Sequence, residues 1–158
     1  MMYVLALLLL CAPSARAEPR DPGPPPYPVA AGDPQDDMAD EINQRRTEAG
    51  CPRIRLRHSL NRAAQGHSAD MARHERLTHR GHDGSRPADR MRAAGYRPAS
   101  SGEVLVVGPT TAGAAVERWM DSPPHRAIIL ACRYTHAGVG VAAGDNGPWW
   151  AVDLAAPQ

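Results

Sequence analysis

The chain has 158 residues, of which 42% are hydrophobic and 22% are charged, and its formal net charge is +1. This length and composition fit a single globular domain. All 18 basic residues are arginine and are scattered among acidic residues, which excludes nucleic-acid binding driven by a basic stripe. Phenylalanine is absent, so the core must rely on aliphatic side chains and three tryptophans.

The N-terminal residues have the pattern of an export signal. Residues 4–12 form an apolar run that is too short to span a bilayer, and Ala15-Arg16-Ala17 is typical of a cleavage site. We therefore predict a signal peptide over residues 1–17, a secreted or cell-envelope location and no transmembrane segment in the mature chain. Residues 18–34 contain seven prolines and little that could be buried, which predicts a disordered leader.

Two cysteines, Cys51 and Cys132, remain once the predicted signal peptide is removed. An even pair of cysteines in an exported protein predicts a disulfide bond between them. Two separate buried thiols are the alternative interpretation.

The central feature of the sequence is an amphipathic helix predicted to begin after the N-cap Ser59. Small and apolar residues recur at three- and four-residue steps along one stripe of this helix, namely Leu60, Ala63, Ala64, His67, Met71 and His74. The pattern decays after Leu77, so we expect Thr78 and His79 on the loop that leaves the helix. A buried helix that delivers a histidine to its exit is a suitable framework for a site.

Further helices are predicted on both sides of this one, and strands are predicted mostly toward the C-terminus. One helix ends near Ala49 before Gly50, another begins at Pro87, and a third follows the cap Thr111. Strands are predicted over residues 103–107, 137–143 and 149–154, with a hairpin turn over residues 144–147. This order favours an α+β fold in which helices pack on a mainly antiparallel sheet.

The spacing of the histidines argues against a zinc-protease helix. That motif needs two histidines four residues apart, whereas His74 and His79 are five apart and would point roughly 100° away from each other. His67 lies on the apolar stripe and is predicted to be a core histidine that is hydrogen-bonded to a neighbour, with a role as a ligand as the alternative. The histidines in polar segments are predicted to be exposed, namely His58, His82 and His136.

Three residues at the ends of predicted elements could converge on one cleft. His79 follows the central helix, Glu103 opens the middle strand, and His125 follows the Ser122-Pro-Pro turn. Two imidazoles and a carboxylate could bind a divalent metal ion with an open position, or they could provide an acid–base pair.

Six short motifs, read in order, resemble the bacterial branch of the CAP superfamily, the SCP-like group of cysteine-rich secretory, antigen 5 and pathogenesis-related proteins. The motifs are His67-Ser-Ala-Asp-Met-Ala, Leu77-Thr-His79-Arg-Gly, Asp89-Arg90 with Ala94-Gly-Tyr96, Gly102-Glu103, Trp119-Met-Asp-Ser-Pro-Pro-His125-Arg with Ile129-Leu130, and Gly138-Val-Gly-Val141. The resemblance implies a CAP domain over residues 35–158, built as a three-layer α-β-α sandwich. It also implies a cleft with a His/Glu/Glu/His cluster.

The resemblance implies specific roles for the three convergent residues. His79 and His125 match the two cleft histidines and are expected to hold zinc or another divalent cation. Glu103 matches the first glutamate and is expected to orient a histidine or a metal-bound water. This chain departs from the family pattern at Val104, where the family has asparagine, and at Ser122, which stands at the usual place of the second glutamate.

The fold alone does not specify a function. Our leading interpretation is a secreted, monomeric, non-enzymatic module that binds a lipid, envelope or surface ligand. One alternative is a metal- or His/Glu-assisted hydrolase, for which His79, Glu103 and His125 are the catalytic candidates. A second alternative is a structural module with a vestigial cleft.

Overall fold

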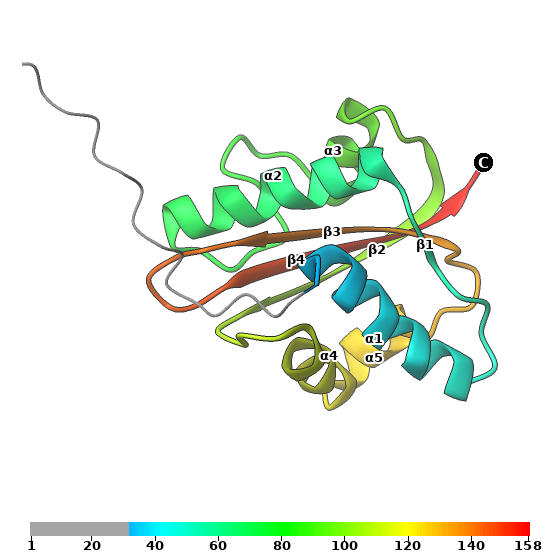
Figure 1. The fold of residues 1–158 in the computed structure, drawn as a ribbon. Helices are drawn as coiled ribbons and strands as arrows, with labels where there is room; N and C mark the ends of the chain where they lie inside the picture. Colours follow the sequence, from blue (N-terminus) through cyan, green and yellow to red (C-terminus); the bar gives the residue numbers. More distant parts are fainter. Residues whose placement is uncertain (1–31) are drawn as a thin grey trace, which may run out of the picture.

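A computed structural model of the protein describes residues 32–158, which form three layers (Figure 1). A four-stranded sheet is covered on one face by α2 (His58–His74) and α3 (Pro87–Ala93). Its other face is covered by α1 (Pro34–Glu48), α4 (Ala112–Met120) and α5 (Pro123–Ile129). The predicted α-β-α sandwich is therefore confirmed. Within the described residues, no helix has the length and apolarity needed to span a membrane.

The strand order in the sheet is β1-β3-β4-β2. The predicted C-terminal hairpin is present as β3 (His136–Ala142) and β4 (Trp149–Pro157). The short β1 (Arg55–Leu56) is parallel to β3, and the other pairs are antiparallel. β2 (Pro98–Val107) starts earlier than the predicted strand over residues 103–107. Residues 98–102 have a low strand propensity, but their pairing with β4 holds them in an extended conformation. Tertiary contacts therefore override the local strand propensity here.

Successive side chains along each strand point to opposite faces of the sheet, so the core has one cluster on each face. Val104, Val106 and Val152 pack toward α1, α4 and α5 in the larger cluster, which includes Trp119 and Trp150. Leu105, Trp149 and Ala151 pack with residues of α2 in a smaller cluster. The indole N–H groups of Trp119 and Trp150 donate to buried backbone carbonyls, so these large side chains bury no unpaired donor.

The ends of the first two helices differ in part from the sequence expectations. Pro34, which we assigned to the leader, is the first residue of α1, and Asp33 Oδ1 accepts a hydrogen bond from the backbone N–H of Gln35 at 2.9 Å. The predicted signal peptide and residues 18–31 of the predicted leader lie outside the described residues. The predicted N-cap Ser59 is wrong, because α2 begins at His58 after Arg57, whose side chain makes no capping bond. α2 depends on packing for its start, and it ends at Glu75 in the left-handed conformation with φ 49°.

Arg46 of α1 is buried in the layer formed by α1, α4 and α5, and it bonds to the backbone of neighbouring segments. Its side chain is fully buried, and its guanidinium donates to the carbonyl oxygens of Pro52, Ile129 and Tyr134 at 3.0, 2.6 and 2.5 Å. The nearby disulfide bond between Cys51 and Cys132 connects the segments that follow α1 and α5, which confirms the predicted pair. The buried guanidinium of Arg46 is thus stabilised by several carbonyl dipoles instead of by a carboxylate.

The backbone of α2 lies directly against β3 at two glycines. A Cβ atom on Gly138 would lie 2.1 Å from the carbonyl carbon of Leu60, and one on Gly140 would lie 2.3 Å from that of Ala64. Asn61 and Gln65 of α2 accept hydrogen bonds from the backbone N–H groups of Val139 and Val141 at 3.1 and 3.0 Å. These amides pair with β3 beyond the end of β1 and so cover part of a strand edge that is otherwise open to pairing.

We predict that Gly140→Ala destabilises the domain by about 3 kcal/mol, because the added methyl group must push the α2 backbone away from the sheet. Gly66 in the middle of α2 is the matched control, since a Cβ there meets no atom within 4 Å. Gly66→Ala should stabilise the domain by about 0.5–1 kcal/mol through helix propensity. Urea unfolding of both variants measures this. Equal stability of the two variants would contradict the close contact.

Candidate functional site

Glu103 is a buried carboxylate held by two cationic or polar partners. Its side chain in β2 is 1% exposed. Oε1 accepts a hydrogen bond from Nδ1–H of His79 at 2.7 Å, and Oε2 accepts one from Nη2 of Arg90 at 2.5 Å. His79 comes from the loop after α2 and Arg90 comes from α3, so the carboxylate joins three segments that are distant in sequence.

Arg90 also fixes the loop that carries His79. Its Nη1 donates to the carbonyl oxygens of His79 and Ser85, each at 3.1 Å. The sequence pattern pointed to Asp89-Arg90 only as part of a family motif and gave no role to the guanidinium. Arg90 and Glu103 form a strong ion pair because the side chain of Arg90 is mostly buried. The planar guanidinium bonds the carboxylate through Nη2 and the carbonyl oxygens through Nη1 at the same time.

The orientation of His79 leaves one ring nitrogen available. Because Nδ1 donates to Glu103, the neutral ring has its lone pair on Nε2. The side chain of His79 is 57% exposed, in contrast to that of Glu103. A carboxylate that orients an imidazole in this way is the usual companion of a histidine that binds a metal ion.

Asp153 is a second buried carboxyl group, and the sequence gave no signal for it. It lies in β4 directly opposite Glu103 in the pairing of β2 with β4, and it is fully buried. Burial and the negative charge of Glu103 raise the pKa of Asp153 well above its ordinary value. One buried arginine cannot balance two buried carboxylates, so the interior favours the protonated form of Asp153.

His67 is buried as predicted, and it also lies beside the site. Its side chain is 0% exposed, and Nε2 donates to the carbonyl oxygen of Thr78 at 2.8 Å. The same nitrogen is 3.9 Å from Oε1 of Glu103. Burial lowers the pKa of His67 despite the charge of Glu103, so the ring is neutral and acts as a hydrogen-bond donor that holds the loop.

His125 lies at the start of α5, and its Nδ1 is 2.8 Å from Oγ of Ser122. Burial lowers the pKa of His125, and the nearby imidazole of His79 lowers it further. No direct bond joins His125 to Glu103 among the described residues. Over residues 32–158, no group of three or more histidine, cysteine, aspartate or glutamate side chains is arranged to hold a metal ion.

The histidines outside this group differ in their surroundings. His58 and His82 are exposed as predicted. His136 is not simply exposed, because it is half-buried between the hydroxyl group of Tyr96 and the guanidinium of Arg57, each at 2.7 Å. The end of β3 places it there, and burial lowers its pKa.

The pattern of the whole domain matches a known family. The profile of the cysteine-rich secretory protein family, CAP, matches residues 39–154. This chain belongs to the CAP family. The departure at Val104 has a structural role here, since the valine is fully buried in the larger core cluster and faces away from Glu103. Ser122, at the second departure, contacts His125.

Curated and solved proteins support the assignment to the CAP family. The chain is 30% identical over 108 residues to the uncharacterized protein YkwD of Bacillus subtilis and covers 41% of its length. It therefore spans less than half of that relative. An extracellular protein with an SCP domain from Bacillus anthracis shares the fold with a TM-score of 0.73 at 22% identity, over 78% of this chain and 40% of the other. An outer surface protein of Borrelia burgdorferi aligns with a TM-score of 0.72 at 19% identity, over 80% of this chain and 97% of the other.

We predict that Asp153→Asn gains stability relative to the unmodified chain as pH rises. The folded chain keeps a proton on Asp153 that the unfolded chain releases near pH 4, so the free energy of unfolding falls with rising pH up to the folded-state pKa. Asparagine removes this loss, which amounts to about 1.4 kcal/mol per pH unit in that window. Urea unfolding between pH 4.5 and 8 measures the difference. Asp145→Asn in the exposed turn before β4 is the control, and a pH-independent difference for Asp153→Asn would show that Asp153 is ionised.

Proposed function

We propose that this CAP domain is a secreted, non-enzymatic binding module that holds a divalent cation between His79 and His125 and uses it to bind a ligand of the cell envelope. The observation that carries the proposal is the geometry at His79. Its Nδ1 is bonded to buried Glu103, and its exposed side chain leaves Nε2 available. His125 likewise has a hydrogen-bond partner at Nδ1, the hydroxyl group of Ser122, which leaves its Nε2 for the cation.

The two imidazoles fit a borderline cation such as zinc. Neutral imidazole nitrogens are preferred zinc ligands, and each ring here has a partner at Nδ1 that favours binding through Nε2. The lowered pKa of His125 keeps that ring neutral to lower pH than an ordinary histidine. A cation bound by two residues keeps open positions, so it could bind an anionic or carbonyl oxygen of the ligand.

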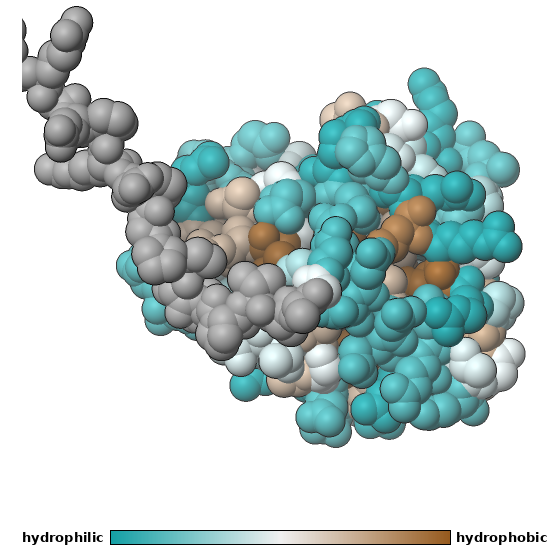
Figure 2. Space-filling view, in the orientation of Figure 1, coloured by the Kyte–Doolittle hydropathy of each residue, from teal (hydrophilic) through white to brown (hydrophobic). Residues whose placement is uncertain are grey.

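The surface favours a polar ligand over a long acyl chain. Leu77, at 48% exposure, is the one large hydrophobic residue that is exposed among residues 32–158, and it lies two residues before His79. Figure 2 shows a mostly hydrophilic face with small, separate hydrophobic areas. Because binding of an acyl chain needs a continuous apolar surface, a lipid head group or another polar envelope component fits better. The extracellular and outer-surface relatives support a location outside the cell.

We predict that zinc binds the full-length chain and that His79→Ala and His125→Ala each weaken this binding by about 100-fold, since each removes a ligand. Glu103→Gln should weaken it by about 10–100-fold, because the amide still contacts His79 but no longer polarises it. His58→Ala removes an exposed histidine and is the control. Titration calorimetry measures the affinities.

Binding of zinc should also weaken as pH falls, because protons compete for Nε2. Equal affinity for the unmodified chain and the His79→Ala, His125→Ala double variant would refute the cation site. The structural alternative, with a vestigial cleft, would then remain.

The hydrolase alternative is favoured by one contact, between Oγ of Ser122 and Nδ1 of His125 at 2.8 Å. A neutral imidazole at this distance can accept the hydroxyl proton of a serine nucleophile. The thiol groups of Cys51 and Cys132 are joined in the disulfide bond and offer no competing nucleophile. If the chain is a serine hydrolase, a fluorophosphonate probe should label Ser122 in the unmodified chain and not in His125→Ala. Absence of labelling would leave the binding module as the better description.

A further inference from the structure

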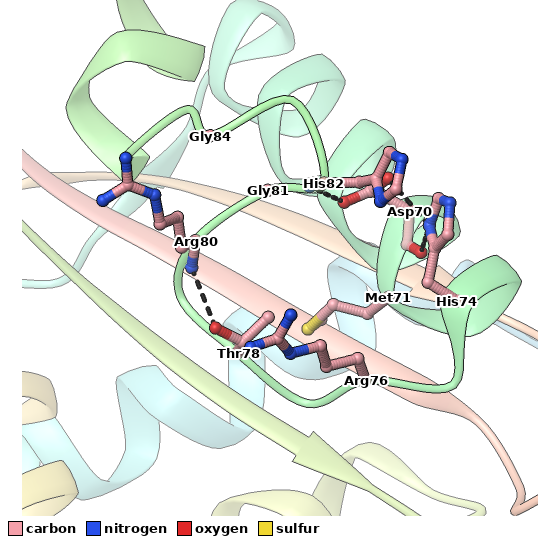
Figure 3. A pocket seen from close by; sticks show the side chains of 9 residues that line it. All are labelled: Asp70, Met71, His74, Arg76, Thr78, Arg80, Gly81, His82 and Gly84. Atoms are coloured by element: carbon pink, nitrogen blue, oxygen red, sulfur yellow. Dashed lines mark hydrogen bonds and ion pairs between the residues drawn. The ribbon is translucent and has the colours of Figure 1, made fainter.

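A second concave site lies at the end of α2, next to the loop that carries His79. The pocket has a volume of about 220 Å³. Its polar lining comes from Asp70 and His74 of α2 and from Arg76, Thr78, Arg80 and His82 of the loop (Figure 3). His79 does not line it, so the loop contributes to two different sites. A pocket of this size is smaller than those that hold drug-sized molecules and suits a small ligand.

The acidic residue in the lining is already paired. Oδ2 of Asp70 accepts a hydrogen bond from the backbone N–H of His82 at 2.9 Å, and Oδ1 lies 3.2 Å from Nδ1 of His74. The rings of His74 and His82 stack with centroids 4.0 Å apart and an angle of 7° between their planes. Parallel rings direct their lone pairs along parallel lines and not toward one point, so this pair is poorly suited to chelate a metal ion. These contacts hold the loop against α2.

The two arginines of the lining are not paired. Neither guanidinium has a hydrogen bond or ion pair with another residue of the described part of the chain. Some arginines elsewhere in the chain do have acidic partners, namely Arg45, Arg53 and Arg92. Figure 3 shows the guanidinium of Arg76 beside Thr78, and the side chain of Arg80 extending along the loop toward Gly84. With Asp70 as the one acid, the lining carries a net charge of at least +1.

We propose that this pocket is a binding site for an oxyanion, the phosphate or carboxylate group of a small molecule. An arginine fork matches two oxygens of either group, and unpaired guanidinium groups in a concave site are the side chains that such ligands require. The site is distinct from the cation site proposed at His79 and His125, because within residues 32–158 no residue of its lining forms a hydrogen bond or ion pair with Glu103 or His125.

The test is a titration of the isotope-labelled full-length chain at pH 7.5, followed by the backbone amide resonances. The probes are inorganic phosphate and acetate, and chloride at matched ionic strength is the reference. Phosphate should produce saturable shifts at Gly81, His82 and Gly84, whereas chloride should not. Saturation by phosphate alone supports a phosphate ligand, and comparable saturation by acetate supports the wider class of oxyanions. Shifts with both probes that equal those with chloride would overturn the proposal.

Variants locate the binding. Replacing Arg76 and Arg80 together with glutamine should raise the dissociation constant for phosphate at least tenfold, and each single replacement should raise it several-fold. Arg73→Gln is the matched control, since Arg73 is an exposed arginine of α2 outside the lining. His125→Ala should also leave phosphate binding unchanged, which separates this site from the proposed cation site. If the Arg76→Gln, Arg80→Gln double variant does not fold, the Arg76→Lys, Arg80→Lys double variant replaces it; it keeps both charges but loses the planar guanidinium groups, so its binding of phosphate should be several-fold weaker. Unchanged binding in the folded double variant would overturn the proposal.

Discussion

The contact between the backbone of α2 and the two glycines of β3 is the constraint on which the rest of the structure depends. Gly138 and Gly140 let the helix approach the sheet more closely than any side chain would allow. Asn61 and Gln65 then bond the helix to the same strand. Because α2 is held in this way, the loop after it leaves at a defined place, and that loop carries both His79 and the arginines of the second pocket.

The polar cluster around Glu103 shows how the fold accommodates charge in its interior. A buried carboxylate is costly unless it is paired, and here Arg90 and His79 occupy its two oxygens. Asp153 adds a second carboxyl group to the same face, and it is tolerated because burial and the charge of Glu103 favour its neutral form. His67 is neutral for the same reason of burial. The cluster therefore combines the ion pair of Glu103 and Arg90 with two groups whose neutral forms are favoured by burial, and it presents the exposed imidazole of His79 to solvent.

The two sites next to the loop have opposite chemical character. At the first, a carboxylate lies behind an exposed imidazole, which suits a cation. At the second, two guanidinium groups that have no partner within residues 32–158 line a small pocket, which suits an anion. Successive residues of the loop belong to different sites, since His79 is bonded to Glu103 whereas its neighbours Thr78 and Arg80 line the pocket.

The sequence by itself determined the order of the helices, the C-terminal hairpin, the disulfide pair and the burial of His67. Each of these follows from a local pattern or from a count, because helical periodicity, turn residues and the one pair of cysteines that follows the predicted signal peptide need no knowledge of distant neighbours. Only the tertiary structure decided that Asp153 lies opposite Glu103, that Arg90 is its partner, and that β2 begins at Pro98. These features depend on strand register and on helix placement, which are set by contacts between residues far apart in the chain. The same holds for the N-terminus of α2, where packing on β3 outweighed the capping preference of Ser59.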